Sequence, residues 1–89
     1  MSTQLQDRAK RFIHQAVPSD IDYVLGSIAE RMITTYAADG ALQRDGETRE
    51  MLELILMETD AMVSKESGAG QAYFRESAEI LRAILGEMA

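Results

Sequence analysis

Glu58 is the residue that fits its position in the sequence least well, because it is an acid in the most apolar stretch of the chain. At about 100° per residue, apolar side chains cover more than half the circumference of a helix over 49–63, and Glu58 lies near the middle of that sector. A carboxylate removed from water is rare unless it is paired. We therefore expect Glu58 to be buried in an ion pair. Arg75 and Arg82 are the favoured partners, and Arg31 is the alternative. The competing interpretation is a proton-sensitive group or a contact with a partner protein.

The rest of the sequence offers little for catalysis or metal binding. It holds one histidine, His14, and no cysteine, so a thiolate metal site, a disulfide and a cysteine nucleophile are excluded. The paired histidines of zinc hydrolases, the phosphate-binding glycine loop and the dinucleotide fingerprint are missing from the sequence. A serine nucleophile lacks a base, because His14 is far away on the polar face of its helix. We expect a protein that is not an enzyme and that has no metal ion or cofactor.

Charge is divided unevenly along the chain. Nine basic and fifteen acidic residues give a net charge of −6, of which residues 1–18 carry +2 and the remainder −8. Arg8, Lys10 and Arg11 form a candidate basic face. Nucleic-acid binding rests largely on basic contacts with phosphate, so the acidic body makes nucleic acid an unlikely partner. Because we see neither a signal peptide nor a spanning segment, we expect a soluble cytoplasmic protein without membrane contact.

Apolar periodicity predicts an all-α fold with a single helical domain over 1–89. A short amphipathic helix is expected at about 3–16, within a basic N-terminal segment over 1–17, and Pro18 separates it from a helical core over 19–89. The core should hold three long helices, at about 20–39, 46–64 and 71–88. We expect these three in an antiparallel hairpin arrangement as a small bundle, with the N-terminal helix packed across them or projecting.

Single residues mark the ends of the predicted helices. Gly40 is expected to end the second helix in the conformation that favours glycine. Asp45 is expected to cap the third helix. The segment 67–70, Ser-Gly-Ala-Gly, is expected to be the most flexible loop in the chain.

Apolar surface on the third and fourth helices predicts a homodimer, since one small bundle would leave part of it uncovered. The fourth helix repeats its apolar residues as a narrow seam over two heptads. We expect the interface to bury about 1,200–2,000 Å² in total. The candidate interface residues are Met51, Leu54, Ile55, Met62, Phe74, Leu81, Ile84, Leu85 and Met88.

Short motifs in the last three helices resemble a known family. Leu25-Gly26, Gly40 with Leu42, Leu54-Ile55 followed by Glu58-Thr59, and the segment from Arg75 to Leu81 occur in the same order as in the AriR/YmgB proteins. These are small enterobacterial regulators of biofilm formation and acid resistance, related to the YcgZ and YmgA connector proteins. The resemblance spans roughly residues 22–85, and the N-terminal helix has no counterpart. It implies a small helical homodimer that acts on signalling through protein contact, with DNA binding proposed for the family.

The sequence therefore predicts a small non-enzymatic regulatory or adaptor protein. It would act as a homodimer that binds another protein, with a component of biofilm or stress signalling as the expected partner. The alternative is an acidic phage- or plasmid-borne inhibitor that blocks a nucleic-acid-binding protein by charge mimicry. A small DNA-binding transcriptional regulator is the third interpretation.

Overall fold

Four α-helices make up nearly all of the described chain. The computed structural model describes residues 2–15, 17–18 and 23–88. The helices are α1 Ser2–His14, α2 Tyr23–Asp39, α3 Gly46–Lys65 and α4 Gly68–Met88. Within the described residues there is no β-strand, so the predicted all-α class is confirmed. The predicted start of the second helix, near residue 20, lies outside the described residues.

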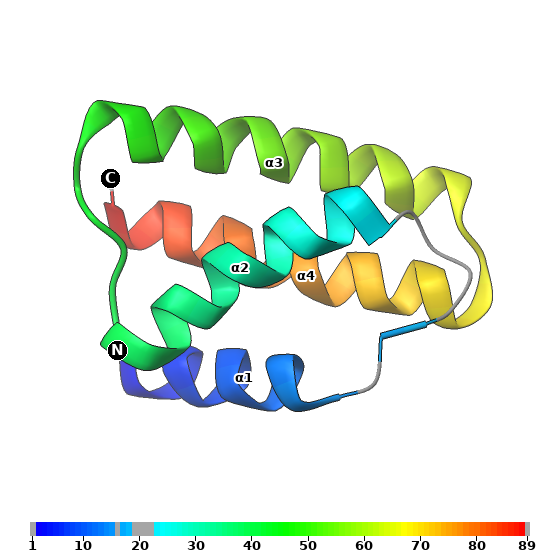
Figure 1. Cartoon of the computed structure of the whole chain (residues 1–89), viewed down its shortest axis with the longest axis horizontal. Coiled ribbons are helices and arrows are strands. Elements are labelled where there is room, and N and C mark those ends of the chain that lie inside the picture. The colour runs from blue at the N-terminus through cyan, green and yellow to red at the C-terminus, as the bar shows by residue number, and fades with distance from the viewer. Residues whose placement is uncertain (1, 16, 19–22, 89) are drawn as a thin grey trace.

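The helices form a bundle in which α1 and α3 lie on opposite sides, with α2 and α4 between them (Figure 1). Helices α1 and α3 each contact α2 and α4, and α2 also contacts α4. Successive helices run in opposite directions (Figure 1). The molecule measures 32 × 24 × 18 Å. The N-terminal helix packs against the rest of the chain rather than projecting from it.

Helices α2 and α4 each contact the other three, and α4 contributes the longest set of buried residues among the described side chains. The most apolar stretch of the sequence lies in α3, but α3 buries fewer residues, namely Leu52, Ile55 and Thr59. A helix that is apolar around most of its circumference must pack against other helices. Its apolar pattern does not show whether it lies at the centre or at the edge of the bundle. The buried residues of α4 are Gly70, Tyr73, Phe74, Ser77, Ala78, Ile80, Leu81 and Ile84.

Local capping sets several of the helix ends. The Oδ1 atom of Asp45 accepts a hydrogen bond from the backbone N–H of Thr48 at 2.6 Å, which makes Asp45 the N-cap of α3. Gly40 follows α2 with φ at +76°, and its N–H donates to the Tyr36 carbonyl at 2.7 Å. Both predictions are confirmed. The predicted loop over 67–70 is wrong, because α4 already begins at Gly68 and includes the buried Gly70.

The buried side of α3 is the side that carries Thr59. This threonine is fully buried, and its Oγ1 donates to the Ile55 carbonyl at 2.6 Å, so its hydroxyl is satisfied within the helix. Leu52 and Ile55 share that side. Because helix positions advance by about 100°, this orientation turns Leu54 and Glu58 towards solvent.

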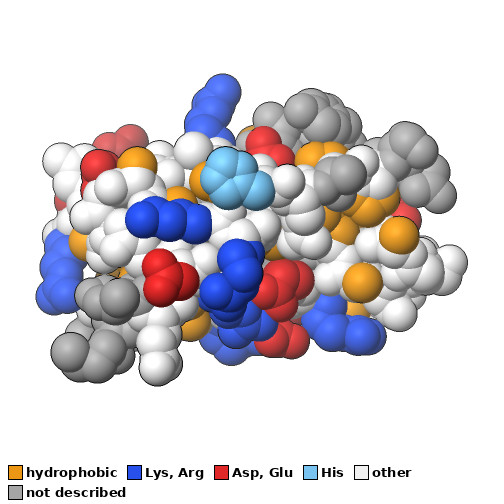
Figure 2. All heavy atoms as spheres, turned by 90° about the horizontal axis from the view of Figure 1, so that it is seen from below, with side chains coloured by type: hydrophobic (Ala, Val, Ile, Leu, Met, Phe, Trp, Pro, Cys, Tyr) orange, Lys and Arg blue, Asp and Glu red, His pale blue; other side chains and the backbone are white. Residues whose placement is uncertain are grey.

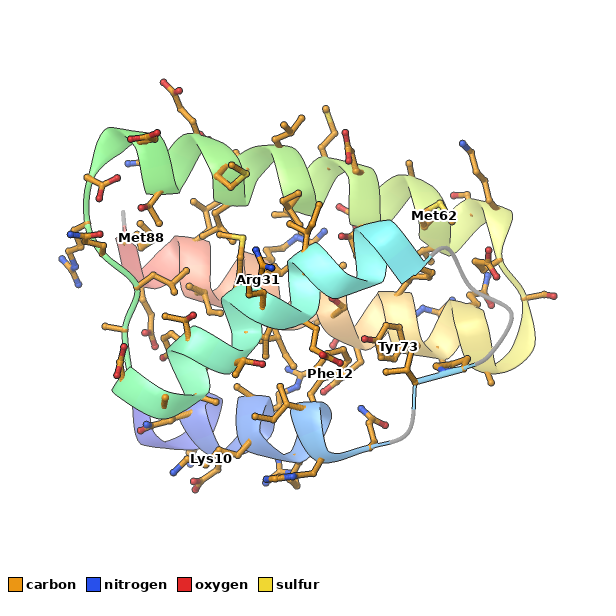
Figure 3. The ribbon with its side chains drawn as sticks, in the orientation of Figure 1. Lys10, Phe12, Arg31, Met62, Tyr73 and Met88 are labelled. Atoms are coloured by element: carbon orange, nitrogen blue, oxygen red, sulfur yellow. The ribbon has the colours of Figure 1, made fainter. Side chains whose placement is uncertain are left out.

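Helix α1 is joined to the body through an aromatic contact. Phe12 is buried, and its ring stacks on Tyr73 of α4 with the centroids 4.9 Å apart. Figure 3 shows the two side chains close together between α1 and α4. A second link is polar, since Nε2 of Gln6 donates to the Ala37 carbonyl at 2.8 Å. That carbonyl lies in the last turn of α2, where backbone acceptors have no partner within the helix.

The packing of α1 can be tested with Phe12→Ala. Removing a fully buried ring leaves a cavity and abolishes the stacking, so we expect the free energy of unfolding to fall by about 3–5 kcal/mol. Urea denaturation followed by circular dichroism measures this change. The control is His14→Ala, an exposed position on the same helix, for which we expect a change below about 0.5 kcal/mol. Equal, small effects of the two variants would show that α1 does not pack on the body.

Candidate functional site

Glu58 lies on the solvent side of α3, so the prediction that it is buried is wrong. Within the part of the chain that the structure describes, no arginine forms an ion pair with it. Arg82 pairs instead with Asp60, with Nη2 and Oδ2 at 2.6 Å. Arg75 is exposed on α4. The physical reason is the orientation of α3: Thr59, rather than Glu58, is the polar residue that the bundle accepts, because its hydroxyl is satisfied by its own helix.

The Arg82–Asp60 pair joins α4 to α3 at the surface. Both side chains are about half exposed, at 55% and 48%. An ion pair so open to water contributes roughly 0–1 kcal/mol. The predicted buried ion pair is thus replaced by a solvated one, and Glu58 is left available for contact with another molecule.

The predicted basic face is interrupted by an ion-pair network between α1 and α4. Arg8 donates through Nε and Nη2 to the two carboxylate oxygens of Glu76, at 2.7 and 2.6 Å, and through Nη2 to Glu79 at 2.6 Å. Figure 2 shows the side of the molecule seen from below, where basic and acidic side chains lie next to one another. Lys10 and Arg11 stay exposed, but Arg8 is engaged within the chain. The prediction that Arg8, Lys10 and Arg11 together form a basic face is therefore wrong.

This network has a direct electrostatic consequence for Glu76. The hydrogen bond from Arg8 lowers the pKa of the Glu76 carboxyl, and the opposite charge of Arg8 lowers it further, while partial burial acts in the other direction. The same contacts raise the pKa of Arg8, which is charged in any case. A carboxyl whose pKa is depressed on folding adds stability above its unfolded pKa and loses it as the pH falls through the folded value.

Replacing Glu76 by Gln tests this coupling. At pH 7 we expect Glu76→Gln to lower the free energy of unfolding by about 0.5–1 kcal/mol, since the pair is one-third exposed and partly screened. The difference from the wild type should shrink as the pH falls below the unfolded-state pKa of about 4.3, and it should vanish once the pH passes the lower folded-state pKa of Glu76. Urea denaturation at a series of pH values measures it. A difference that persists unchanged at about pH 2 would show that packing, not charge, is responsible.

The outer side of α3 exposes a stripe of large apolar side chains. Met51, Leu54 and Met57 retain 49%, 47% and 63% of their accessible surface. They stand three residues apart on one helix, so they lie along one side of it. We call this surface the α3 stripe. Large side chains exposed together, rather than singly, are typical of an interaction site.

A shallow groove runs along each side of the α3 stripe. Towards α2, a groove of about 420 Å³ includes Met32, Leu42 and Met51 in its lining, with Arg31 and Glu47. Towards α4, a groove of about 330 Å³ is lined by Glu53, Leu56, Met57, Asp60 and Leu85. Both grooves join apolar side chains of neighbouring helices to the stripe. Figure 3 shows Arg31 on α2.

The candidate dimer interface divides into three groups in the structure. Four of its residues belong to the core of the single chain and are not available to a second copy: Ile55, Phe74, Leu81 and Ile84. Three are partly buried against that core: Met62, Leu85 and Met88. Met51 and Leu54 are exposed as an interface requires. Sequence analysis missed Met57, whose spacing of three residues from Leu54 was the available signal.

Another groove, of about 550 Å³, lies where α1 meets the beginning of α4. Its lining includes Arg8, Arg11, Phe12, Tyr73 and Glu76. The Arg8–Glu76 pair occupies part of this wall, and the lowered pKa of Glu76 makes it a poor proton donor or acceptor near neutral pH.

Among the described residues, no group of three or more histidine, cysteine, aspartate or glutamate residues is placed to hold a metal ion. None of the helices described has the length and hydrophobicity that crossing a membrane requires.

Comparison with protein-family models, with curated proteins and with solved structures finds no match for this chain. The similarity to the AriR/YmgB proteins stays a prediction. The candidate site is therefore the surface formed by the α3 stripe and its two grooves.

Proposed function

We propose that this chain is a non-enzymatic regulatory or adaptor protein that acts by binding another protein through the α3 stripe. The observation that carries this proposal is the exposure of Met51, Leu54 and Met57 on one side of one helix. The folded chain leaves about half or more of each of these side chains uncovered, and methionine is well suited to adaptable contact surfaces. Only the resemblance to the AriR/YmgB proteins supports a role in biofilm or stress signalling.

A second candidate function is the acidic inhibitor of a nucleic-acid-binding protein. It is favoured by the charge of α3, which carries five acidic and two basic residues. A DNA-binding regulator is supported less well, because Arg8 is paired with Glu76 and Glu79 and only Lys10 and Arg11 remain of the basic face.

Site-specific photo-crosslinking tests whether the stripe meets another protein. A photoreactive benzoylphenylalanine at position 57, the most exposed of the three stripe residues, should trap a defined protein partner in the native cell. The same residue at position 4, exposed on α1 at the opposite side of the bundle, is the control. We expect Leu54→Asp to abolish the adduct from position 57, because a buried unpaired charge opposes apolar contact. Identical adducts from both positions, or none from position 57, would contradict the proposal.

The homodimer is a separate part of the proposal. The accessible surface of the chain is 5374 Å². A compact protein of this mass is expected to expose about 5,200 Å², so the single chain is already close to normal compactness and a second copy is not needed to complete its core. Self-association is then limited to the exposed stripe, where the surrounding carboxylates of two copies repel each other.

We therefore expect a weak homodimer that salt strengthens, because screening reduces this repulsion while leaving apolar contact in place. Sedimentation velocity at about 0.02 M and about 0.5 M sodium chloride measures it, with a larger dimer fraction expected at high salt. Leu54→Asp should give a monomer in both solutions. If the wild-type chain sediments with a mass of 9.9 kDa at both salt concentrations, the prediction of a homodimer is wrong.

A further inference from the structure

The α3 stripe is bordered by carboxylates. Five acidic side chains are exposed on this helix: Glu47, Glu50, Glu53, Glu58 and Asp60. Of these, only Asp60 forms an ion pair within the described part of the chain, with Arg82. The two basic residues of the helix leave it with a net charge of −3. Apolar and acidic side chains therefore alternate on one surface, and a partner must satisfy both.

We infer that the α3 stripe binds an amphipathic helix of a basic partner protein. The apolar face of that helix covers Met51, Leu54 and Met57, and its flanking lysine or arginine side chains pair with carboxylates such as Glu50 and Glu58. This inference rests on the proposed function, and it specifies the chemistry of the partner.

The shape of the surface fits a helix. The stripe extends for about 9 Å along α3, and the two grooves widen it on both sides with side chains of α2 and α4. A helix packs against such a surface by placing residues at three- and four-residue spacing into the depressions beside a ridge. Met32 on one side and Leu85 on the other, both partly exposed, provide apolar contacts beyond the stripe.

Charge complementarity distinguishes this partner from a second copy of the chain. In a symmetric pairing of two antiparallel α3 helices about Leu54, Met51 of each copy faces Met57 of the other. The same symmetry places Glu50 opposite Glu58, both exposed and both acidic. Like charges across an interface are unfavourable, whereas a basic rim on the partner converts the same residues into attractive contacts. Lys10 and Arg11 lie on α1, on the far side of the bundle, whereas Arg31 lines the groove towards α2 and Arg82 is paired with Asp60.

Three synthetic peptides of equal length test the inference. The first is an amphipathic helix with leucine along one side and lysine beside it, the second has glutamate in place of lysine, and the third is a scrambled form of the first that keeps its charge but loses its apolar side. Fluorescence anisotropy measures their affinity for the full chain, and amide chemical shifts map the binding surface. We expect the first peptide to bind at least about tenfold more tightly than either of the others, with shifts centred on α3.

Matched charge variants show where the peptide binds. Glu50→Lys and Glu58→Lys should each weaken binding of the first peptide by about tenfold, because each turns an attraction into a repulsion. Asp7→Lys makes the same change of charge on the exposed side of α1 and should change the affinity by less than about twofold. Binding should also weaken with added salt, the opposite of the expected homodimer.

The outcomes separate this inference from the proposed function. If the scrambled basic peptide binds as tightly as the first, charge alone is responsible and the helix-docking inference is wrong. If none of the peptides binds while position 57 still yields a defined adduct with another protein, the inference fails while the proposed function stands. If the adduct has twice the mass of the chain, the occupant is a second copy, and only the homodimer part of the proposal stands. If none of the peptides binds and position 57 yields no adduct, the inference and the proposed function both fail.

Discussion

The structure depends on the burial of one side of α4, which contacts each of the other helices. This buried side combines the small residues Gly70, Ser77 and Ala78 with larger apolar ones. The Ser77 hydroxyl has no hydrogen-bond partner among the described residues, which costs about 1–3 kcal/mol. That cost is offset by the close packing of large side chains around it, such as Phe74 and Leu81.

The position of α4 determines the roles of the other helices. Helices α1 and α3 lie on opposite sides, so each has one side directed outward. The outward side of α1 is polar, with Asp7, Lys10, Arg11 and His14 exposed, as expected for a helix that only faces water. The outward side of α3 instead exposes Met51, Leu54 and Met57. This difference between two helices in equivalent positions is the structural basis for treating α3 as the interaction surface.

Local features of the fold follow from the sequence because they depend on few residues. The cap at Asp45 and the left-handed glycine at position 40 are set by side-chain chemistry within one helical turn. The all-α class follows from periodicity, which is repeated in every helix. These predictions are independent of how the helices are arranged in space.

The burial of particular residues depends on that arrangement, and here the sequence was less informative. Around α3 the apolar residues are so numerous that two opposite sides qualify as the core face. The side with Glu58 and Leu54 is as apolar as the side with Leu52 and Thr59, but only the second can be buried without an unpaired charge. A threonine hydroxyl can donate to a backbone carbonyl of its own helix, as that of Thr59 does. This property could have shown which of the two sides of α3 is buried. On α4, the apolar seam does not show whether it faces the core of its own chain or a second copy, and this placed core residues such as Phe74 and Ile84 in the candidate interface.

The mixture of side chains on α3 also bears on the choice between a helix-binding adaptor and a mimic of nucleic acid. A mimic must present regularly spaced negative charge to a surface that evolved to contact phosphates, and such surfaces are strongly basic and polar. Three large apolar side chains among the carboxylates would be a liability in that contact, because they would face polar groups and lose little water. A basic helix with an apolar face uses both kinds of side chain. The apolar residues then supply the affinity, and the carboxylates select the partner and orient it.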